Sequence, residues 1–212
     1  YINLEIAGHK IGLYVVLFIV FAETGLLAGF FLPGDSLLFL SGIYSKALLS
    51  ELIVIESDFL NVLCVASLVA LAGIIGNLFG YWFGAKSGNY LYQKEDGFLF
   101  KKKYLFESKA FFEKHGGRAI IFARFLPVVR TFTPIIAGVA NMEFKKFVFY
   151  NIISSVAWSF SLIFAGHYLY RFLLDSYNFD LTHYIEYIII VIIAITTVPF
   201  VIKLIKNKRE KK

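Results

Sequence analysis

Three long, nearly uncharged apolar stretches restrict the fold of this chain more than any other feature. They cover residues 61–85, 147–170 and 184–205. At about 1.5 Å per residue, a helix over each stretch is long enough to cross about 30 Å of hydrocarbon. Hydrophobic residues make up 58% of the sequence, more than in a typical water-soluble domain. We therefore expect an all-α polytopic membrane protein, with one domain over residues 1–212 and these stretches as its three transmembrane helices.

Two further apolar regions, residues 11–45 and 119–142, contain charged and helix-breaking residues and do not fit simple spanning helices. FLPGDSL interrupts the first at 31–37, and FLPVVRTFTP interrupts the second at 125–134. Broken backbone is tolerated at membrane depth where protein or a wet cavity surrounds it. We expect each region to form a re-entrant hairpin of two short helices. The residues expected to break these helices are Pro33, Gly34, Pro127 and Pro134.

Loop charges orient the chain. Segment 86–118 carries eight basic and four acidic residues, the tail 206–212 is basic, and segment 46–58 is net acidic. The positive-inside rule places segment 86–118 and the C-terminus in the cytoplasm. The two hairpins then open to opposite sides of the membrane. Within the basic loop, stretch 104–114 is either an amphipathic helix in the interface or a solvated connector.

A short repeat links the two hairpins. Phe-Leu-Pro occurs at residues 31–33 and again at 125–127, and a long apolar stretch follows each hairpin. Two related units of opposite orientation are the arrangement of inverted-repeat transporters, whose site lies at the repeat interface near the midplane. The sequence therefore predicts an inverted-repeat, transporter-like fold.

Four charged side chains lie inside the hairpins, where they are costly. The first hairpin supplies Glu23 and Asp35, and the second supplies Arg124 and Arg130. A guanidinium suits bidentate contact with phosphate and stays charged, whereas a buried carboxylate can exchange a proton. We assign phosphate binding to the two arginines and proton coupling to the two carboxylates. The alternative is that the four residues only pair with one another and fix the hairpins together.

Other functions find less support in the residues. Cys64 is the only cysteine, the four histidines are scattered, and no glycine-rich nucleotide loop occurs. We therefore expect no enzyme, catalytic residue, metal or cofactor. The net charge of +6 is assigned to loops beside an anionic membrane surface, not to nucleic-acid binding. A proton-coupled exporter of small cations or drugs is the competing transporter, but it gives the paired arginines no role.

Two helix faces carry further predictions. Glycines recur every four residues at Gly76, Gly80, Gly84 and Gly88, which predicts a smooth ridge for close helix packing. Packing against a hairpin of the same chain is the favoured interpretation, and a homodimer seam is the alternative. In the stretch 147–170, the residues expected to turn a polar side toward the site are Asn151, Ser154, Ser155 and Trp158. Ordinary core packing is the other interpretation of the tryptophan.

Four ordered motifs carry a family resemblance. They are ETG at 23–25, FLPGDSLLF at 31–39, EKHGG at 113–117 and FARFLPVVRTFTPIIAG at 122–138. Together they resemble the DedA family of bacterial inner-membrane proteins, which shares its core with the VTT-domain class. The resemblance extends over nearly the whole chain, from about residue 11 to residue 206.

The resemblance implies a role in moving lipids. Some DedA-like proteins return undecaprenyl phosphate, a lipid carrier for wall polymers, across the cytoplasmic membrane, and VTT-domain proteins include phospholipid scramblases. The family's functional acids and arginines map onto Glu23, Asp35, Arg124 and Arg130. The implied partners are a phosphate-bearing lipid, the bilayer and protons. One departure is Asn77, where many members have an acid, so no coupling role is carried over to that position.

Overall fold

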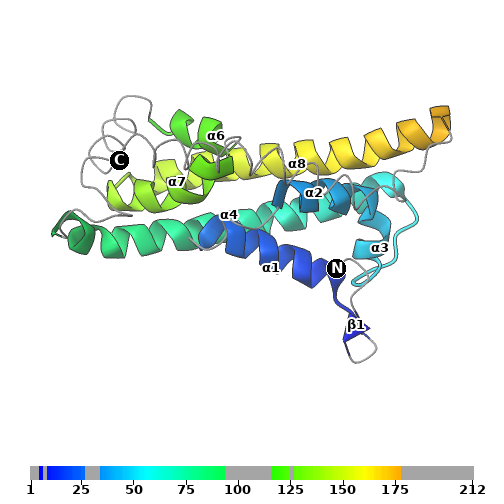
Figure 1. The fold of residues 1–212 in the computed structure, drawn as a ribbon, viewed down its shortest axis with the longest axis horizontal. Helices are drawn as coiled ribbons and strands as arrows, with labels where there is room; N and C mark the ends of the chain where they lie inside the picture. The colour runs from blue at the N-terminus through cyan, green and yellow to red at the C-terminus, as the bar shows by residue number, and fades with distance from the viewer. Residues whose placement is uncertain (1–4, 7–8, 27–33, 94–115, 125–126, 178–212) are drawn as a thin grey trace, which may run out of the picture.

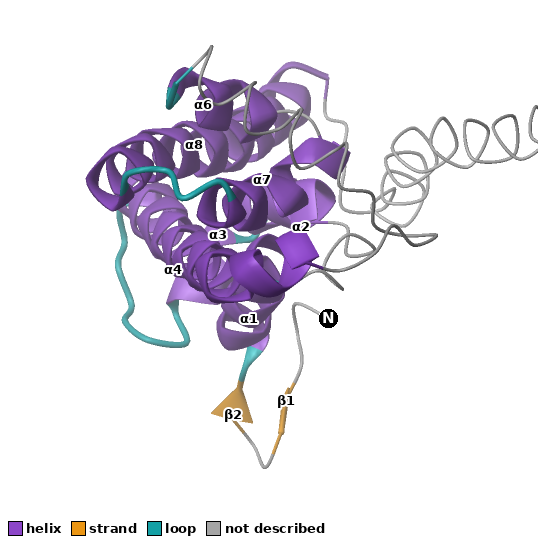
Figure 2. Ribbon diagram, turned by 90° about the vertical axis from the view of Figure 1, so that its left-hand side faces the viewer, coloured by secondary structure: helices purple, strands orange, loops and turns teal. Residues whose placement is uncertain are grey.

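The computed structural model describes residues 5–6, 9–26, 34–93, 116–124 and 127–177. Its elements, labelled as in Figure 1, are β1 (Glu5–Ile6), β2 (His9–Lys10), α1 (Gly12–Gly25), α2 (Gly34–Ile43), α3 (Ser45–Leu49), α4 (Asp58–Gln93), α6 (Arg118–Arg124), α7 (Pro127–Val139) and α8 (Phe144–Tyr177). The two strands form a short antiparallel ladder that projects from the helices (Figure 2). All the other elements of the described structure are α-helices, as predicted.

Two long helices form the axis of the molecule. α4 has 36 residues and α8 has 34, and they lie along the long axis in Figure 1. Both are long and apolar enough to cross a membrane, over Asp58–Gly88 and Phe144–Tyr177. None of the four prolines falls in either helix, so their backbone hydrogen bonds run without interruption. They contain two of the three predicted spanning stretches, 61–85 and 147–170.

The short helices are arranged in two pairs. α2 lies toward one end of the long helices, whereas α6 and α7 lie toward the other (Figure 1). α1 ends at Gly25 and α2 begins at Gly34, so the first predicted region is broken near the expected point. α6 ends at Arg124 and α7 begins at Pro127, where the second break was expected. Each broken region is therefore a pair of short helices.

One predicted break is wrong, because Pro134 lies inside α7, which continues to Val139. A proline here removes only one backbone hydrogen bond of the helix. The Cβ of Pro134 lies 3.3 Å from the position a side chain at Gly80 would occupy. The ring of Pro134 therefore packs against the bare stretch of α4 at Gly80.

Within each pair of short helices, the two outer ends lie close together. The backbone N–H of Leu13, at the start of α1, donates to Glu51 Oε2 at 2.9 Å, just beyond α3. At the other pair, Ile120 of α6, Ala137 of α7 and Phe147 of α8 belong to one buried cluster. The start of the first helix and the end of the second therefore lie near each other in each pair.

The second helix of each pair packs against one of the two long helices. α2 packs on α8, where Gly42 faces the carbonyl of Ile163 and Gly166 faces the carbonyl of Phe39. α7 packs on α4 in the same manner, and the facing residues are Gly84 with the Ile135 carbonyl and Gly138 with the Tyr81 carbonyl. A Cβ at any of these glycines would overlap the facing backbone. The second helix of each pair thus packs on the long helix that follows the other pair.

The glycine ridge of α4 packs against other helices of the same chain. Gly76 faces Thr24 and the backbone of α1, whereas Gly80, Gly84 and Gly88 face α7. These contacts agree with the favoured interpretation of the repeat, in which it packs within the same chain. Large apolar side chains elsewhere face outward, including Phe18 on α1, Phe122 on α6 and Phe149 on α8. Their exposure suits a surface in contact with lipid.

Several predicted features lie outside the described residues. They are the third spanning stretch at 184–205, the basic tail 206–212, the interfacial helix at 104–114, Pro33, and Phe125 and Leu126 of the second repeat motif.

Candidate functional site

The four predicted charged residues meet where the short helices end. Glu23 lies in the last turn of α1 and Asp35 in the first turn of α2. Arg124 is the last residue of α6, and Arg130 lies near the start of α7. Three of them contact Trp158, near the middle of α8, and Glu23 joins the cluster through Arg130. The break in each helix pair therefore delivers charged groups to the centre of the molecule.

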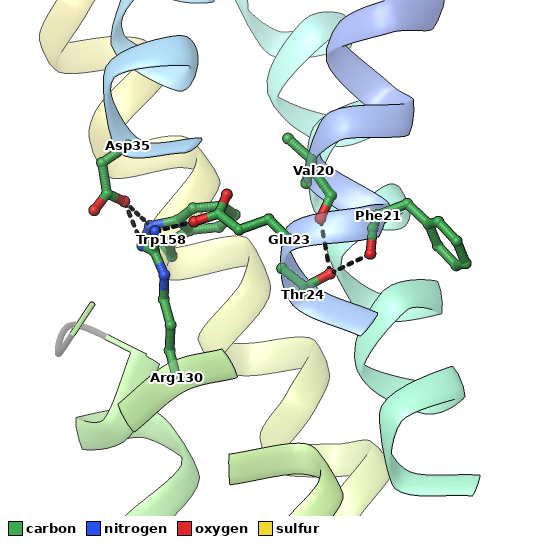
Figure 3. A network of polar contacts seen from close by, with 7 residues as sticks. All are labelled: Val20, Phe21, Glu23, Thr24, Asp35, Arg130 and Trp158. Atoms are coloured by element: carbon green, nitrogen blue, oxygen red, sulfur yellow. Dashed lines mark hydrogen bonds and ion pairs between the residues drawn. The ribbon is translucent and has the colours of Figure 1, made fainter. Parts of the chain in front are cut away.

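Arg130 bridges both carboxylates of the first pair. Its Nη2 donates to Glu23 Oε1 and its Nη1 donates to Asp35 Oδ1 (Figure 3). The side chains of Glu23 and Arg130 are 2% and 6% exposed, and that of Asp35 is 26% exposed. One guanidinium thus joins α1, α2 and α7 through a buried, charge-assisted contact.

Two local features shape the surroundings of Glu23. The hydroxyl of Thr24 lies 2.9 Å from the carbonyl oxygen of Val20 and so reinforces the last turn of α1 (Figure 3). Gly34 faces the Glu23 carboxylate so closely that a Cβ at this position would overlap it. The glycine of the FLPGDSL motif is therefore needed for space as well as for the break in the helix.

Trp158 contacts three of the four charged residues. Its indole N–H donates to Asp35 Oδ1 at 2.8 Å (Figure 3). The guanidinium carbons of Arg124 and Arg130 lie 4.5 Å and 5.1 Å from its ring centroid, within the range of cation–π contacts. The tryptophan itself is 2% exposed. It was predicted to face the site, but its contacts with both arginines were not.

Arg124 differs from Arg130 in its hydrogen bonding. The residue is 3% exposed, and its Nε and Nη2 have no hydrogen-bond partner within the described part of the chain. Nη2 points at the bare backbone of Gly73, where a Cβ would lie 2.7 Å away. A buried donor without a partner is unfavourable, and an ionised one more so. The site therefore offers charged N–H groups that could donate hydrogen bonds to an anion.

A second polar group lies beside the cluster, between α4 and α8. Asn77 Nδ2 donates to Asn151 Oδ1 at 2.6 Å, and Ser155 Oγ lies 3.2 Å from the same oxygen. Asn151 and Ser155 are fully buried, and Asn77 Oδ1 has no partner among the described residues. The polar side of α8 thus faces inward, as predicted. Asn77, to which no coupling role was assigned, is part of this uncharged network.

The structure therefore brings together all four predicted charged residues, with Gly34 beside them. Pro127 begins α7 and marks the break that allows Arg124 and Arg130 to share one centre. Pro134 lies away from the cluster, against Gly80. The interpretation that the charges only fix the helix pairs together fits Arg130. It leaves the two unpaired donors of Arg124 unexplained.

Comparisons with known proteins point to one family. Residues 32–168 match the model of the VTT domain. The chain is 37% identical over 205 residues to Protein DedA of Escherichia coli (strain K12), covering 96% of this chain and 87% of that protein. It is 37% identical over 197 residues to an uncharacterized membrane protein of Mycobacterium tuberculosis (strain ATCC 25618 / H37Rv), covering 93% of this chain and 80% of that protein. It is also 34% identical over 151 residues to Inner membrane protein YghB of Escherichia coli (strain K12), covering 68% and 63%. No solved structure matches the chain.

Proposed function

Because the chain belongs to the VTT-domain family that includes Protein DedA, and is a helical membrane protein, we propose that it transports a phosphate-bearing lipid across the bacterial cytoplasmic membrane. The substrate we propose is undecaprenyl phosphate, returned across the bilayer with coupling to the proton gradient. The observation that carries the proposal is the buried guanidinium of Arg124, with unpaired donors beside a cluster already neutralised by its own carboxylates.

The unequal pairing of the two arginines favours an anionic ligand. Two carboxylates and two guanidiniums have no net charge when all are ionised, and Arg130 already takes both carboxylates. A small cation at Glu23 or Asp35 would compete with Arg130, which contacts one oxygen of each carboxylate, although Glu23 Oε2 has no partner among the described residues. A phosphate would accept hydrogen bonds from Nε and Nη2 of Arg124, which have no partner among the described residues. These groups therefore support a phosphate carrier over the competing cation exporter.

A lipid suits the surroundings of this centre. α6 is a single short helix with Arg124, 3% exposed, on its inner side and Phe122, 71% exposed, on its outer side. A helix with its side chains is only about 10–12 Å across. A phosphate head at Arg124 could therefore lie near a long apolar tail that remains in the bilayer. The tail would then never cross the polar centre.

The exchanged packing of the helix pairs supports an alternating-access mechanism. We propose that α1/α2 and α6/α7 are re-entrant hairpins of two inverted repeats, opening to opposite sides, with the C-terminus and segment 86–118 in the cytoplasm. The helix tips that carry the four charges then meet near the midplane, where such transporters bind substrate. Movement of one pair relative to the other would expose the centre to each side in turn.

The two carboxylates provide a route to proton coupling. Protonation of Glu23 or Asp35 removes one of the two negative charges in the cluster and so strengthens the attraction of Arg124 for a phosphate. Release of the proton restores that negative charge and favours release of the lipid. Binding of the anion and binding of a proton then support each other, as coupled transport of both requires.

A substrate panel tests the proposal. Purified protein in liposomes is scored for movement of undecaprenyl phosphate, a zwitterionic phospholipid and a small cation, with and without a proton gradient. We expect movement of undecaprenyl phosphate alone, at a rate that depends on the gradient. Equal movement of both lipids identifies a non-selective scramblase, and movement of the cation alone identifies an exporter. Either result rejects the proposed function.

A further inference from the structure

Trp158 occupies the centre of the charge cluster although it carries no charge. α8 contributes none of the four predicted charged residues, yet this one side chain touches Asp35, Arg124 and Arg130. These residues come from three different short helices, so Trp158 contacts both halves of the molecule. A core tryptophan that only fills space needs none of these polar contacts.

We propose that Trp158 is a positioning residue that gives the two arginines different roles, an inference that rests on the proposed function. Its ring supports both guanidiniums, and its N–H fixes the carboxylate that Arg130 also holds. Arg130 is thereby committed to Glu23 and Asp35. Arg124 contacts the ring through its guanidinium, and its Nε and Nη2, which have no partner among the described residues, are available to the phosphate of a lipid.

The geometry of a guanidinium explains this division. The group is planar, and its five N–H donors point outward in the plane. A guanidinium on the face of an aromatic ring therefore keeps its donors available for an acceptor at its edge. Arg130 uses Nη1 and Nη2 on carboxylates and keeps only Nε without a partner, whereas both Nε and Nη2 of Arg124 have no partner among the described residues. Arg124 therefore offers two unused donors, and Arg130 offers only one.

The indole N–H adds a second function. Asp35 Oδ1 accepts both from Trp158 Nε1 and from Arg130 Nη1, so the two donors converge on one oxygen. Asp35 is also the most exposed of the bridged residues, at 26%. Without the tryptophan, this carboxylate would be held by Arg130 alone, on a partly solvated helix end. The N–H therefore keeps Asp35 in the bridge that occupies Arg130.

Tryptophan fluorescence tests the inference directly. The chain has two tryptophans, and Trp82 is 54% exposed on α4, away from the cluster. In a Trp82→Phe variant, Trp158 is the only reporter. We expect undecaprenyl phosphate in detergent micelles to change its emission in a saturable manner, whereas the uncharged polyprenol does not. The same change should disappear in Trp82→Phe/Arg124→Gln. A saturable response that survives the loss of Arg124 overturns the assigned division.

Two substitutions at Trp158 distinguish the contribution of its ring from that of its N–H. Ligand binding is measured by the rise that the ligand causes in the thermal unfolding midpoint of the protein. Trp158→Leu removes both features and should weaken undecaprenyl phosphate binding roughly tenfold or more, because a desolvated cation–π contact is lost. Trp158→Phe keeps an aromatic face and should restore most of the binding. Trp82→Leu is the matched control and should bind as wild type.

The outcomes distinguish the inference from the proposed function. If wild type binds and Trp158→Leu binds equally well, the inference fails and the proposed function stands. Should Trp158→Leu fail to fold, Trp158→Phe decides, because binding as weak as that of Arg124→Gln would show that the ring face does not suffice. If folded wild type does not bind undecaprenyl phosphate, both the proposed function and the inference fail.

Discussion

Arg130 and Glu23 lie 107 residues apart in the sequence and form a buried ion pair. The same guanidinium also holds Asp35, so its removal would leave two carboxylates close together without a counter-ion. Breaking a buried pair on one side costs about 3–5 kcal/mol. We therefore expect Arg130→Ala to lower the unfolding free energy by about this amount. Arg124→Ala should cost less stability, because it removes a charge whose donors lack partners.

Unfolding in mild detergent, followed by far-UV circular dichroism, measures this difference. The two variants remove the same atoms from neighbouring helices, so each is the control for the other. If both lose stability equally, the two arginines do not have the distinct environments described above.

Gly34 gives a prediction about space. A Cβ at this position would overlap the Glu23 carboxylate. We expect Gly34→Ala to displace Glu23 from Arg130 and to destabilise the protein by about 1–3 kcal/mol. Gly88→Ala is the matched control, because its Cβ would meet only ordinary contacts at 3.5 Å from Val139. It should be neutral or slightly stabilising, since alanine is a better helix former. Equal thermal midpoints for the two variants would argue against the close contact.

The carboxylates should govern the response to protons. Glu23→Gln and Asp35→Asn each remove one titrating group from the Arg130 bridge while leaving a polar side chain of similar size. We expect either variant to reduce the dependence of lipid transport on pH, and the double variant to abolish it. Transport assayed in liposomes over a pH series measures this. A wild-type rate that ignores both pH and the proton gradient would remove proton coupling from the account.

The glycine ridge yields a test of assembly. Because Gly84 faces the backbone of α7, Gly84→Val should unfold or weaken the single chain. A ridge that formed a homodimer seam would instead give a stable chain with a changed oligomeric state. Thermal unfolding combined with multi-angle light scattering in detergent distinguishes these results. A shift in mass without loss of stability would contradict the intramolecular packing.

The parts of the structure that were predicted correctly depend on local pattern. Uncharged apolar runs indicated α4 and α8, and the Pro-Gly and proline breaks indicated two pairs of short helices. The four charges were expected to meet, because charged residues inside apolar segments need partners. Pro134 was misjudged because its effect depends on packing against Gly80, a contact that local sequence does not reveal.

The role of Trp158 could not be predicted for a related reason. An apolar helix with a tryptophan has the same pattern whether the ring contacts lipid, core or charge. Trp82 and Trp158 look alike in the sequence, but one is 54% exposed and the other 2%. The unequal environments of the two arginines also arise only from the assembled structure. In the sequence, Arg124 lies a few residues before Pro127 and Arg130 lies a few residues after it. The hydrogen bond from Asn77 to Asn151, which lies on another helix, likewise could not be predicted from the local sequence.

The central claim is that the free edge of Arg124 binds the phosphate of a transported lipid. The most direct measurement is the initial rate of undecaprenyl phosphate movement in liposomes, for wild type, Arg124→Lys and Arg124→Gln at equal amounts of folded protein. Charge-assisted hydrogen bonds contribute roughly 1.5–3 kcal/mol each, so we expect Arg124→Gln to lose about tenfold or more. Arg124→Lys should recover only part of the rate, because an ammonium lacks the planar fork. A wild-type rate retained in Arg124→Gln would contradict the account.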